Sequence, residues 1–227
     1  MSKQASKHPA LDPERVAAVE KFGGKIIPLS PIGAEVSGID LSSGHTPPPD
    51  VLDALEQEMA RRGFLVFKNE GQLDAEDFLR ASCWWGGKEL HSTHVVHPAT
   101  PGRNPHIFRL SNDRRHGIPG VGPQWHNDGS FIPATFSHSG YHIIRPPENG
   151  GGTYFAHQGI AHEALPEDRK EYWGRLSSVN SASGVVHPMV HEHPVSGQKC
   201  IWLHLGMTGA IIEKRPGEDG FRLLRED

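Results

Sequence analysis

The chain has 227 residues, 36% of them hydrophobic, which is enough to bury one sizeable core without requiring a second domain. A formal net charge of -4 gives no basic excess, so the composition argues against a nucleic-acid or anionic-membrane partner and favours a small-molecule partner. Cys83 and Cys200 stand outside any C-x-x-C spacing, which predicts reduced thiols rather than a disulfide framework or a thiolate zinc site.

The N-terminal segment is polar. From Met1 to Arg15 it has no apolar stretch of the kind that a signal peptide carries, and no apolar run elsewhere approaches the length of a membrane span. The sequence therefore predicts a soluble, cytoplasmic protein with a polar extension at residues 1–24 and one domain at residues 25–227. It leaves the oligomeric state open, with a homo-oligomer as one option.

Two helices are predicted in the first part of this domain. The first begins at Asp50, which can act as its N-cap, and ends at Gly63, with apolar residues recurring at helical spacing between them. Residues 64–67 then form an apolar run typical of a buried strand. The second helix begins at Asp74 and ends at Gly86-Gly87.

Beyond residue 100 the pattern changes to short strands separated by Gly, Pro and Asn turns. The predicted strands cover residues 107–110, 124–128, 140–145, 153–157, 179–186 and 199–205. A short helix is predicted between Pro166 and Leu176, outside the strand core. The spacing favours a sandwich or jelly roll, so the predicted fold class is α+β with a β core and flanking helices.

The sharpest local signal is Trp125-His126-Asn127-Asp128. On a strand, the period of two would point His126 and Asp128 to the same face. One imidazole and one carboxylate are two thirds of the facial triad of non-haem iron(II) oxygenases, and the 16 histidines of the chain also suggest metal chemistry. Taken alone, however, these four residues favour a surface turn, because Asn127-Asp128-Gly129 is good turn chemistry.

Five segments in a fixed order change this interpretation, because together they resemble the TauD/TfdA family of Fe(II)- and 2-oxoglutarate-dependent oxygenases. The segments are residues 33–41 (GAEVSGIDL), 63–67 (GFLVF), 125–131 (WHNDGSF), 151–153 (GGT) and 187–197 (HPMVHEHPVSG). The resemblance runs from about Lys25 to the last residue and so covers nearly the whole chain.

The resemblance implies a double-stranded β-helix (jelly roll) that uses Fe(II), 2-oxoglutarate and O2 to oxidise a C–H bond of a small organic substrate, releasing succinate and CO2. It implies that His126 and Asp128 bind the iron, that Thr153 donates a hydrogen bond to the 2-oxoglutarate carboxylate, and that His97 contacts the substrate. The alternative for His97 is a solvated histidine in a loop. Gly122 stands where members that take taurine carry an asparagine, which argues against taurine itself.

Two residues of the family pattern cannot be assigned within the 227 residues. They are the distal histidine that completes the iron triad and the arginine that pairs with 2-oxoglutarate, both of which follow the paired His-Pro stretch in the family. We therefore expect the C-terminal part of the β core to be missing and turnover to be poor. The alternative is an impaired fragment or pseudoenzyme that binds ligand without turnover. A zinc hydrolase would instead predict H-E-x-x-H or a comparable helical pair, which the sequence lacks.

The remaining histidines of this region are predicted to have other roles. His187 and His193 each precede a proline, so we expect structural roles at turns. His191 lies between them and is expected to be structural or solvated. His204 falls in the predicted strand at residues 199–205, and nothing in its spacing identifies it as a ligand.

Overall fold

The structure, a computed structural model, describes residues 12–68, 73–86, 89–92 and 94–224. The chain divides into two compact units: unit 1 comprises Met1–Arg109 and Gly140–His157, and unit 2 comprises Leu110–Ser139 and Gln158–Asp227. Both units contain helices and short strands, so the predicted mixture of α and β structure is confirmed. Within the parts of the chain that the structure describes, no helix has both the length and the apolar composition needed to cross a bilayer.

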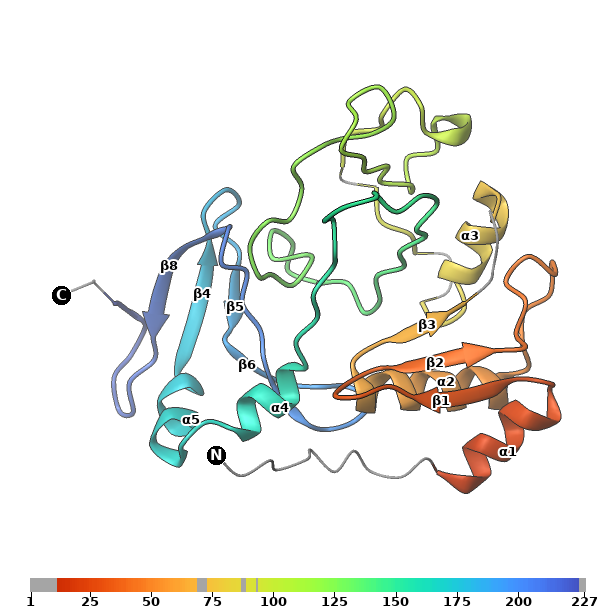
Figure 1. Ribbon diagram of the computed structural model, residues 1–227. Coiled ribbons are helices and arrows are strands. Elements are labelled where there is room, and N and C mark those ends of the chain that lie inside the picture. The colour runs from red at the N-terminus through yellow and green to blue at the C-terminus, as the bar shows by residue number, and fades with distance from the viewer. Residues whose placement is uncertain (1–11, 69–72, 87–88, 93, 225–227) are drawn as a thin grey trace. The chain divides into compact units, whose positions relative to one another are not determined.

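Unit 1 contains a three-stranded sheet with β2 in the centre, antiparallel to β1 and parallel to β3 (Figure 1). Its elements in chain order are α1 (Pro13–Lys21), β1 (Lys25–Pro28), β2 (Ala34–Ser37), α2 (Pro49–Arg62), β3 (Leu65–Phe67), α3 (Ala75–Ser82) and the 3-10 turn η1 (Pro101–Arg103). The helix α1 falls within the segment that the sequence marks only as a polar extension. Its Val19 is fully buried in the core of this unit.

The core of unit 1 is formed by side chains from helices and strands together. Val19 of α1, Val36 of β2 and Leu55 of α2 have no exposed surface. Burying an aliphatic side chain of this size stabilises the folded state by about 1.5–3 kcal/mol. Because one face of α2 supplies several such residues, the helix is fixed against the sheet.

The boundaries of α2 differ from the prediction at one end. The N-cap is Pro48, which makes no side-chain cap bond, and Asp50 lies in the first turn, so its predicted capping role is wrong. A proline suits the start of a helix because its nitrogen has no hydrogen to leave unbonded. Gly63 ends the helix as predicted, with φ of 96° and its N–H donating to the carbonyl of Met59.

Helix α3 begins as predicted and ends earlier. The Asp74 carboxylate accepts a hydrogen bond from the Asp77 N–H, which confirms the predicted N-cap. The helix stops at Ser82 rather than at Gly86-Gly87, because the N–H of Cys83 bonds three residues back to the Arg80 carbonyl and tightens the last turn. Gly87 lies outside the described residues.

Unit 2 is built around an antiparallel four-stranded sheet of order β5-β4-β8-β9, drawn in blue in Figure 1, and a separate β6-β7 pair. Its elements are α4 (Gln158–Glu163), α5 (Glu167–Trp173), β4 (Leu176–Asn180), β5 (Val186–Pro188), β6 (Val190–Glu192), β7 (Lys199–Ile201), β8 (Thr208–Glu213) and β9 (Arg222–Leu223). The predicted outer helix is confirmed as α5. The predicted strand at residues 179–186 is interrupted: residues 179–180 end β4, residues 181–185 form the connecting turn, and β5 begins at Val186. The predicted strand at 199–205 ends at Ile201.

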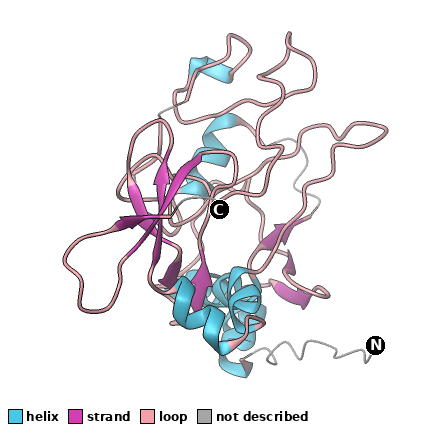
Figure 2. Cartoon of the chain, turned by 90° about the vertical axis from the view of Figure 1, so that its left-hand side faces the viewer, coloured by secondary structure: helices cyan, strands magenta, loops and turns pink. Residues whose placement is uncertain are grey.

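Four predicted strands, at residues 107–110, 124–128, 140–145 and 153–157, are wrong: these segments are loops, drawn in pink in Figure 2. A strand requires a ladder of backbone hydrogen bonds to a neighbour, whereas β propensity reports only how side chains fit a sheet surface. Among the described residues these segments make single contacts instead, such as the isolated bridge between Leu110 and Ile118. The sheets of the described residues are therefore small and separate.

Candidate metal centre

His126 and Asp128 lie side by side in unit 2, where the sequence predicts the metal pair. His126 Nε2 is 3.5 Å from Asp128 Oδ1, and their side chains are 26% and 40% exposed. The segment is a loop that enters a turn at Asp128, so the two side chains converge through local turn geometry rather than through the alternation of a strand. The site is open enough for an ion to enter from solvent.

The tautomer of His126 follows from its hydrogen bond. Nδ1 lies 2.7 Å from the carbonyl oxygen of Gln124, and because a carbonyl can only accept, Nδ1 carries the proton. In the neutral ring the lone pair is then on Nε2, the atom that faces Asp128. A neutral imidazole held by one nitrogen with the other free to bind a metal is the usual arrangement of metal-ligating histidines.

The carboxylate of Asp128 is oriented in a comparable way. Its Oδ2 accepts a hydrogen bond of 3.1 Å from the Ser139 hydroxyl, while Oδ1 faces His126. The Thr135 hydroxyl donates to the Asp128 backbone carbonyl at 2.9 Å, which closes the turn beneath the side chain. Both halves of the pair are therefore held through one atom and present the other to the same small volume.

The donor set fits a divalent metal of the iron type. Two cis ligands at a metal–ligand distance of about 2.1 Å lie roughly 3 Å apart, close to the observed 3.5 Å. One imidazole and one carboxylate match two of the three ligands of the facial triad that suits Fe(II). Among the described residues, no group of three or more His, Cys, Asp or Glu side chains gathers closely enough to hold an ion.

Residues 203–205 are bonded to the metal-pair segment at two points. The Leu205 N–H donates to the Trp125 carbonyl at 3.1 Å, and the Leu203 N–H donates to the Asn127 side-chain oxygen, also at 3.1 Å. These bonds bring the ring of His204 to 5.0 Å from that of His126, centroid to centroid. Burial, together with the nearby His126, lowers the pKa of His204, so its imidazole favours the neutral form.

The turn that follows Asp128 is also bonded to strand β4. Asn180, at the end of β4, donates its side-chain N–H to the Ser130 hydroxyl at 2.9 Å, and both residues are buried. The Asn180 side-chain oxygen accepts from the N–H groups of Ala182 and Ser183. The four-stranded sheet is thus connected to the metal pair through a buried polar contact two residues beyond Asp128.

Two predicted site residues fall in unit 1, apart from the unit that holds the pair. Thr153 is exposed and lies in a loop, so the prediction that it occupies a neighbouring strand is wrong, while its role toward 2-oxoglutarate stays a prediction. His97 is half-buried and its Nδ1 accepts from the N–H of Ala99 at 3.1 Å, which stabilises a local turn. Its contact with substrate likewise stays a prediction.

The histidines of the paired His-Pro stretch make structural contacts, as the sequence predicts, although His187 lies in β5 and not at a turn. His187 is buried and its Nε2 contacts the Ile132 carbonyl at 2.9 Å, while His193 Nδ1 accepts from the N–H groups of two residues in the turn between β6 and β7. His191 packs against Trp202 with ring centroids 5.7 Å apart. These three histidines therefore contact protein groups of unit 2.

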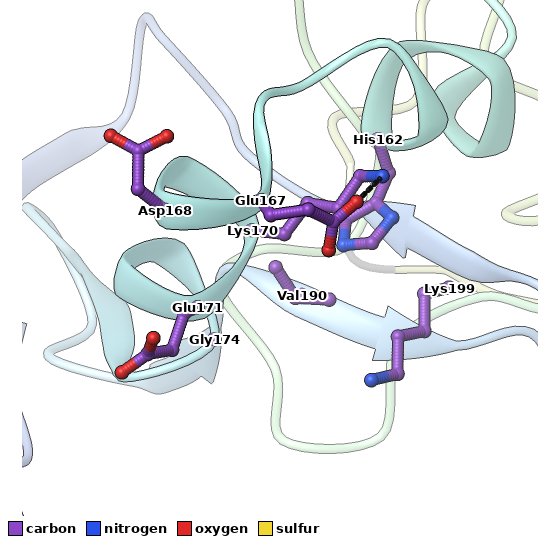
Figure 3. A pocket seen from close by; sticks show the side chains of 8 residues that line it. All are labelled: His162, Glu167, Asp168, Lys170, Glu171, Gly174, Val190 and Lys199. Atoms are coloured by element: carbon purple, nitrogen blue, oxygen red, sulfur yellow. Dashed lines mark hydrogen bonds and ion pairs between the residues drawn. The ribbon is translucent and has the colours of Figure 1, made fainter.

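An open hollow of about 560 Å³ lies elsewhere in unit 2, over α4, α5 and the β6-β7 pair (Figure 3). Its lining residues are His162, Glu167, Asp168, Lys170, Glu171, Gly174, Val190 and Lys199. Lys170 and Glu167, both on α5, form an ion pair of 2.7 Å in its lining. None of the predicted site residues lines this hollow, and charges of both signs do not select one class of ligand.

Several residues that shape the metal pair were not predicted from the sequence to contact it. Ser139 is 11 residues from Asp128 in the sequence, and its hydrogen bond to that carboxylate depends on the path of the loop. Gln124 contributes only its backbone carbonyl, which any residue could supply. Gly122 lies directly against the ring of His126, and Asn127 makes a long-range backbone contact. Glycine commonly adopts a positive φ, as Gly122 does, but the sequence does not show that the His126 ring lies against it.

Comparison with known proteins identifies the family. The family model described as "Taurine catabolism dioxygenase TauD, TfdA family" matches residues 25–223. The chain belongs to this family. The sequence-based assignment to the TauD/TfdA family is therefore confirmed. The matched range includes His97, His126, Asp128 and Thr153, whose roles stay predictions.

Relatives with assigned activities are distant and longer. The α-ketoglutarate-dependent sulfate ester dioxygenase of Pseudomonas putida is 26% identical, with 76% of this chain covered and 63% of that protein. The α-ketoglutarate-dependent sulfonate dioxygenase of Saccharomyces cerevisiae is 24% identical, with 86% and 52% covered. The chain thus spans between about half and two thirds of the length of these two relatives.

The fold of a solved family member is also similar. The crystal structure of a taurine dioxygenase from Burkholderia xenovorans matches with a TM-score of 0.64 at 21% identity, covering 83% of this chain and 65% of that one. At this identity the likeness concerns the fold.

Proposed function

We propose that this protein is an Fe(II)- and 2-oxoglutarate-dependent oxygenase that oxidises a C–H bond of a small organic substrate, releasing succinate and CO2. One observation carries the proposal: His126 Nε2 and Asp128 Oδ1 face each other at 3.5 Å, each held in place through the other polar atom of its side chain. Membership of the TauD/TfdA family supports the choice of iron over other divalent metals.

In this proposal His126 and Asp128 hold the iron, which together with 2-oxoglutarate supplies the activation of O2. Gln124 keeps the proton on Nδ1 of His126, so the lone pair stays on Nε2. Ser139 donates to Oδ2 of Asp128 and so keeps Oδ1 turned toward the metal. The protein thereby supplies two preoriented ligands that need no rearrangement when the ion binds.

The remaining roles come from the family resemblance. We propose that Thr153 donates its hydroxyl hydrogen to a 2-oxoglutarate carboxylate and that His97 contacts the substrate. The exposed position of Thr153 leaves its hydroxyl accessible to a ligand. We also propose that the sheets of the protein correspond to the double-stranded β-helix of its relatives, which the likeness to a solved taurine dioxygenase supports.

The substrate is proposed to be a small organic anion. The relatives are described as dioxygenases of sulfate esters, sulfonates and, at 27% identity, 2,4-dichlorophenoxyacetate, all of which are anions. A panel of alkyl sulfates, alkyl sulfonates and aryloxyacetates therefore tests the range directly. The measurement is substrate-dependent succinate formation from 2-oxoglutarate in the presence of O2, iron(II) and ascorbate.

Bound iron tests the metal pair itself. His126→Ala should abolish iron(II) binding because it removes one of two protein ligands, whereas His191→Ala, a histidine packed on Trp202, should change it little. Iron is measured after anaerobic equilibration and gel filtration. Equal losses in the two variants would show that the wrong histidine has been assigned. Iron and 2-oxoglutarate binding without succinate formation would favour a ligand-binding protein without turnover.

A further inference from the structure

Gly122 contacts the proposed iron ligand His126 in a way that leaves no room for a side chain. A β-carbon built on Gly122 would lie 2.8 Å from Cε1 of the His126 ring and 3.5 Å from Nε2. Real β-carbons essentially never approach another heavy atom within 3.0 Å, so any other residue would force the ring to move. The Cε1 edge of the imidazole therefore occupies the space that a side chain at position 122 would need.

Two further contacts hold the same ring. Nδ1 is bonded to the Gln124 carbonyl at 2.7 Å, and the ring packs on that of His204 at 5.0 Å with an interplanar angle of 31°. His204 is itself fixed, because its carbonyl accepts from the N–H of Met207 and from both the N–H and the hydroxyl of Thr208. The ring of His126 thus has a hydrogen-bonded atom, a packed neighbour and a close glycine.

We propose that Gly122 is a positioning residue for His126: its lack of a side chain allows the ring orientation in which Nε2 faces Asp128. The proposal rests on the proposed function, because it concerns how that metal ligand is presented. It extends that function by assigning a role to a residue that has no side chain with which to bind the metal. Its consequence is that one added methyl group at position 122 displaces the metal-binding nitrogen.

The chain offers a matched control two residues away. Gly120 has the same φ as Gly122, 69°, but a β-carbon built on it would meet no heavy atom within 4 Å. Alanine at either position imposes the same unfavourable left-handed backbone. Gly122→Ala and Gly120→Ala therefore differ in the contact with His126 and not in the backbone strain.

The first measurement uses the metal-free 227-residue protein and observes the His126 ring by long-range proton–nitrogen NMR correlation, with the signals assigned by their loss in His126→Ala. Gly120→Ala should leave the ring nitrogen shifts and the Nδ1–H tautomer unchanged. Gly122→Ala should shift them and reduce the tautomer preference, because the ring leaves the Gln124 carbonyl. Identical His126 signals in the two variants would overturn the proposal.

The second measurement is Co(II) affinity, taken relative to His126→Ala as the background from other histidines. Gly122→Ala should weaken the His126-dependent affinity about tenfold relative to Gly120→Ala, as expected when the support of a metal ligand is disturbed. Equal affinities of the two variants would contradict the proposal. If wild type shows no His126-dependent binding, the proposed function fails, while the ring signals still decide the role of Gly122.

If Gly122→Ala folds poorly, a double-mutant cycle on the melting temperature still tests the proposal. In the wild-type background Gly122→Ala should lower the melting temperature more than Gly120→Ala does. In a His126→Ala background the ring is gone, so the excess effect of Gly122→Ala should disappear. An excess that persists without the imidazole would show that Gly122 meets some other constraint and would refute its role toward His126.

Discussion

The helix-and-sheet core of unit 1 and the metal-pair loop of unit 2 are stabilised in different ways. In the core, Val19, Val36 and Leu55 are fully buried, and each contacts several others, so no single contact decides the arrangement. In the loop, the orientation of His126 depends on a hydrogen bond to the Gln124 carbonyl and on packing against His204, and Asp128 accepts a hydrogen bond from the Ser139 hydroxyl. Many apolar contacts together fix the core, whereas a few identified contacts fix the orientation of each side chain at the site.

This difference has a consequence for where substitutions act. A change in the core lowers the stability of the fold as a whole, because apolar burial is roughly additive in area. A change in the loop alters the direction of one atom and leaves most of the burial intact. Function and stability are therefore expected to respond to different residues, and substitutions can separate them.

The largest expected effect lies in the core, at an ion pair that breaks the apolar pattern. Glu58 and Arg62 of α2 are both buried and joined by a bond of 2.7 Å. Glu58→Ala would leave the Arg62 guanidinium without this carboxylate in a buried setting and should lower the free energy of unfolding by about 3–5 kcal/mol.

The control for this prediction is the exposed Glu167–Lys170 pair of α5, also one turn apart on a helix. Glu167→Ala should change stability little, because solvent screens the pair. Both variants are measured by urea unfolding monitored by circular dichroism. A similar loss of stability in the two would show that burial does not determine what these ion pairs contribute.

The sequence predicted the core of unit 1 better than the rest of the fold. The helix ending at Gly63 and the cap at Asp74 depend on local rules that the neighbouring residues satisfy. The strand predicted at residues 124–128 failed because its formation requires a hydrogen-bonded partner strand, which side-chain propensity does not report. Local signals therefore predicted helix ends well and sheet pairing poorly.

At the site, the sequence predicted which residues pair and not what supports them. His126 and Asp128 could be found because their spacing brings them together either on a strand or in a turn. Ser139 and His204 could not, since each reaches the pair through the long-range path of a loop. The motif consists of neighbouring residues and can be recognised in the sequence, whereas these two residues that support it are distant in the sequence.

A smaller effect on stability is expected where the sheet of unit 2 meets the metal-pair turn. Asn180→Ala removes the buried bond to the Ser130 hydroxyl and two partly buried bonds to backbone N–H groups, and should cost about 1–3 kcal/mol. Ser130→Ala removes only the first of these and should cost less. Thermal unfolding of both variants checks the order. A larger loss for Ser130→Ala would show that the turn, and not the Asn180 contacts, is the critical element.

The smallest expected effect is a pH dependence at His191. Burial, reinforced by the neighbouring His187, lowers the pKa of His191 below its ordinary value of 6.5, and in the described part of the chain its shielded Nε2 has no hydrogen-bond partner. The unfolded chain therefore binds a proton at a higher pH than the folded one does. The contribution to stability is fully present above pH 6.5 and is lost as the pH falls toward the lowered folded pKa.

His191→Phe tests this dependence, because phenylalanine keeps a ring against Trp202 and cannot take up a proton. Between about pH 8 and about pH 5.5, wild type should lose more unfolding free energy than His191→Phe does, while the two should behave alike at the upper end of this range. The same substitution at the exposed His45 controls for the removal of a histidine. Parallel pH profiles for wild type and His191→Phe would mean that the folded protein accommodates a charged His191. The partial burial of this histidine would then carry no measurable cost for its protonation.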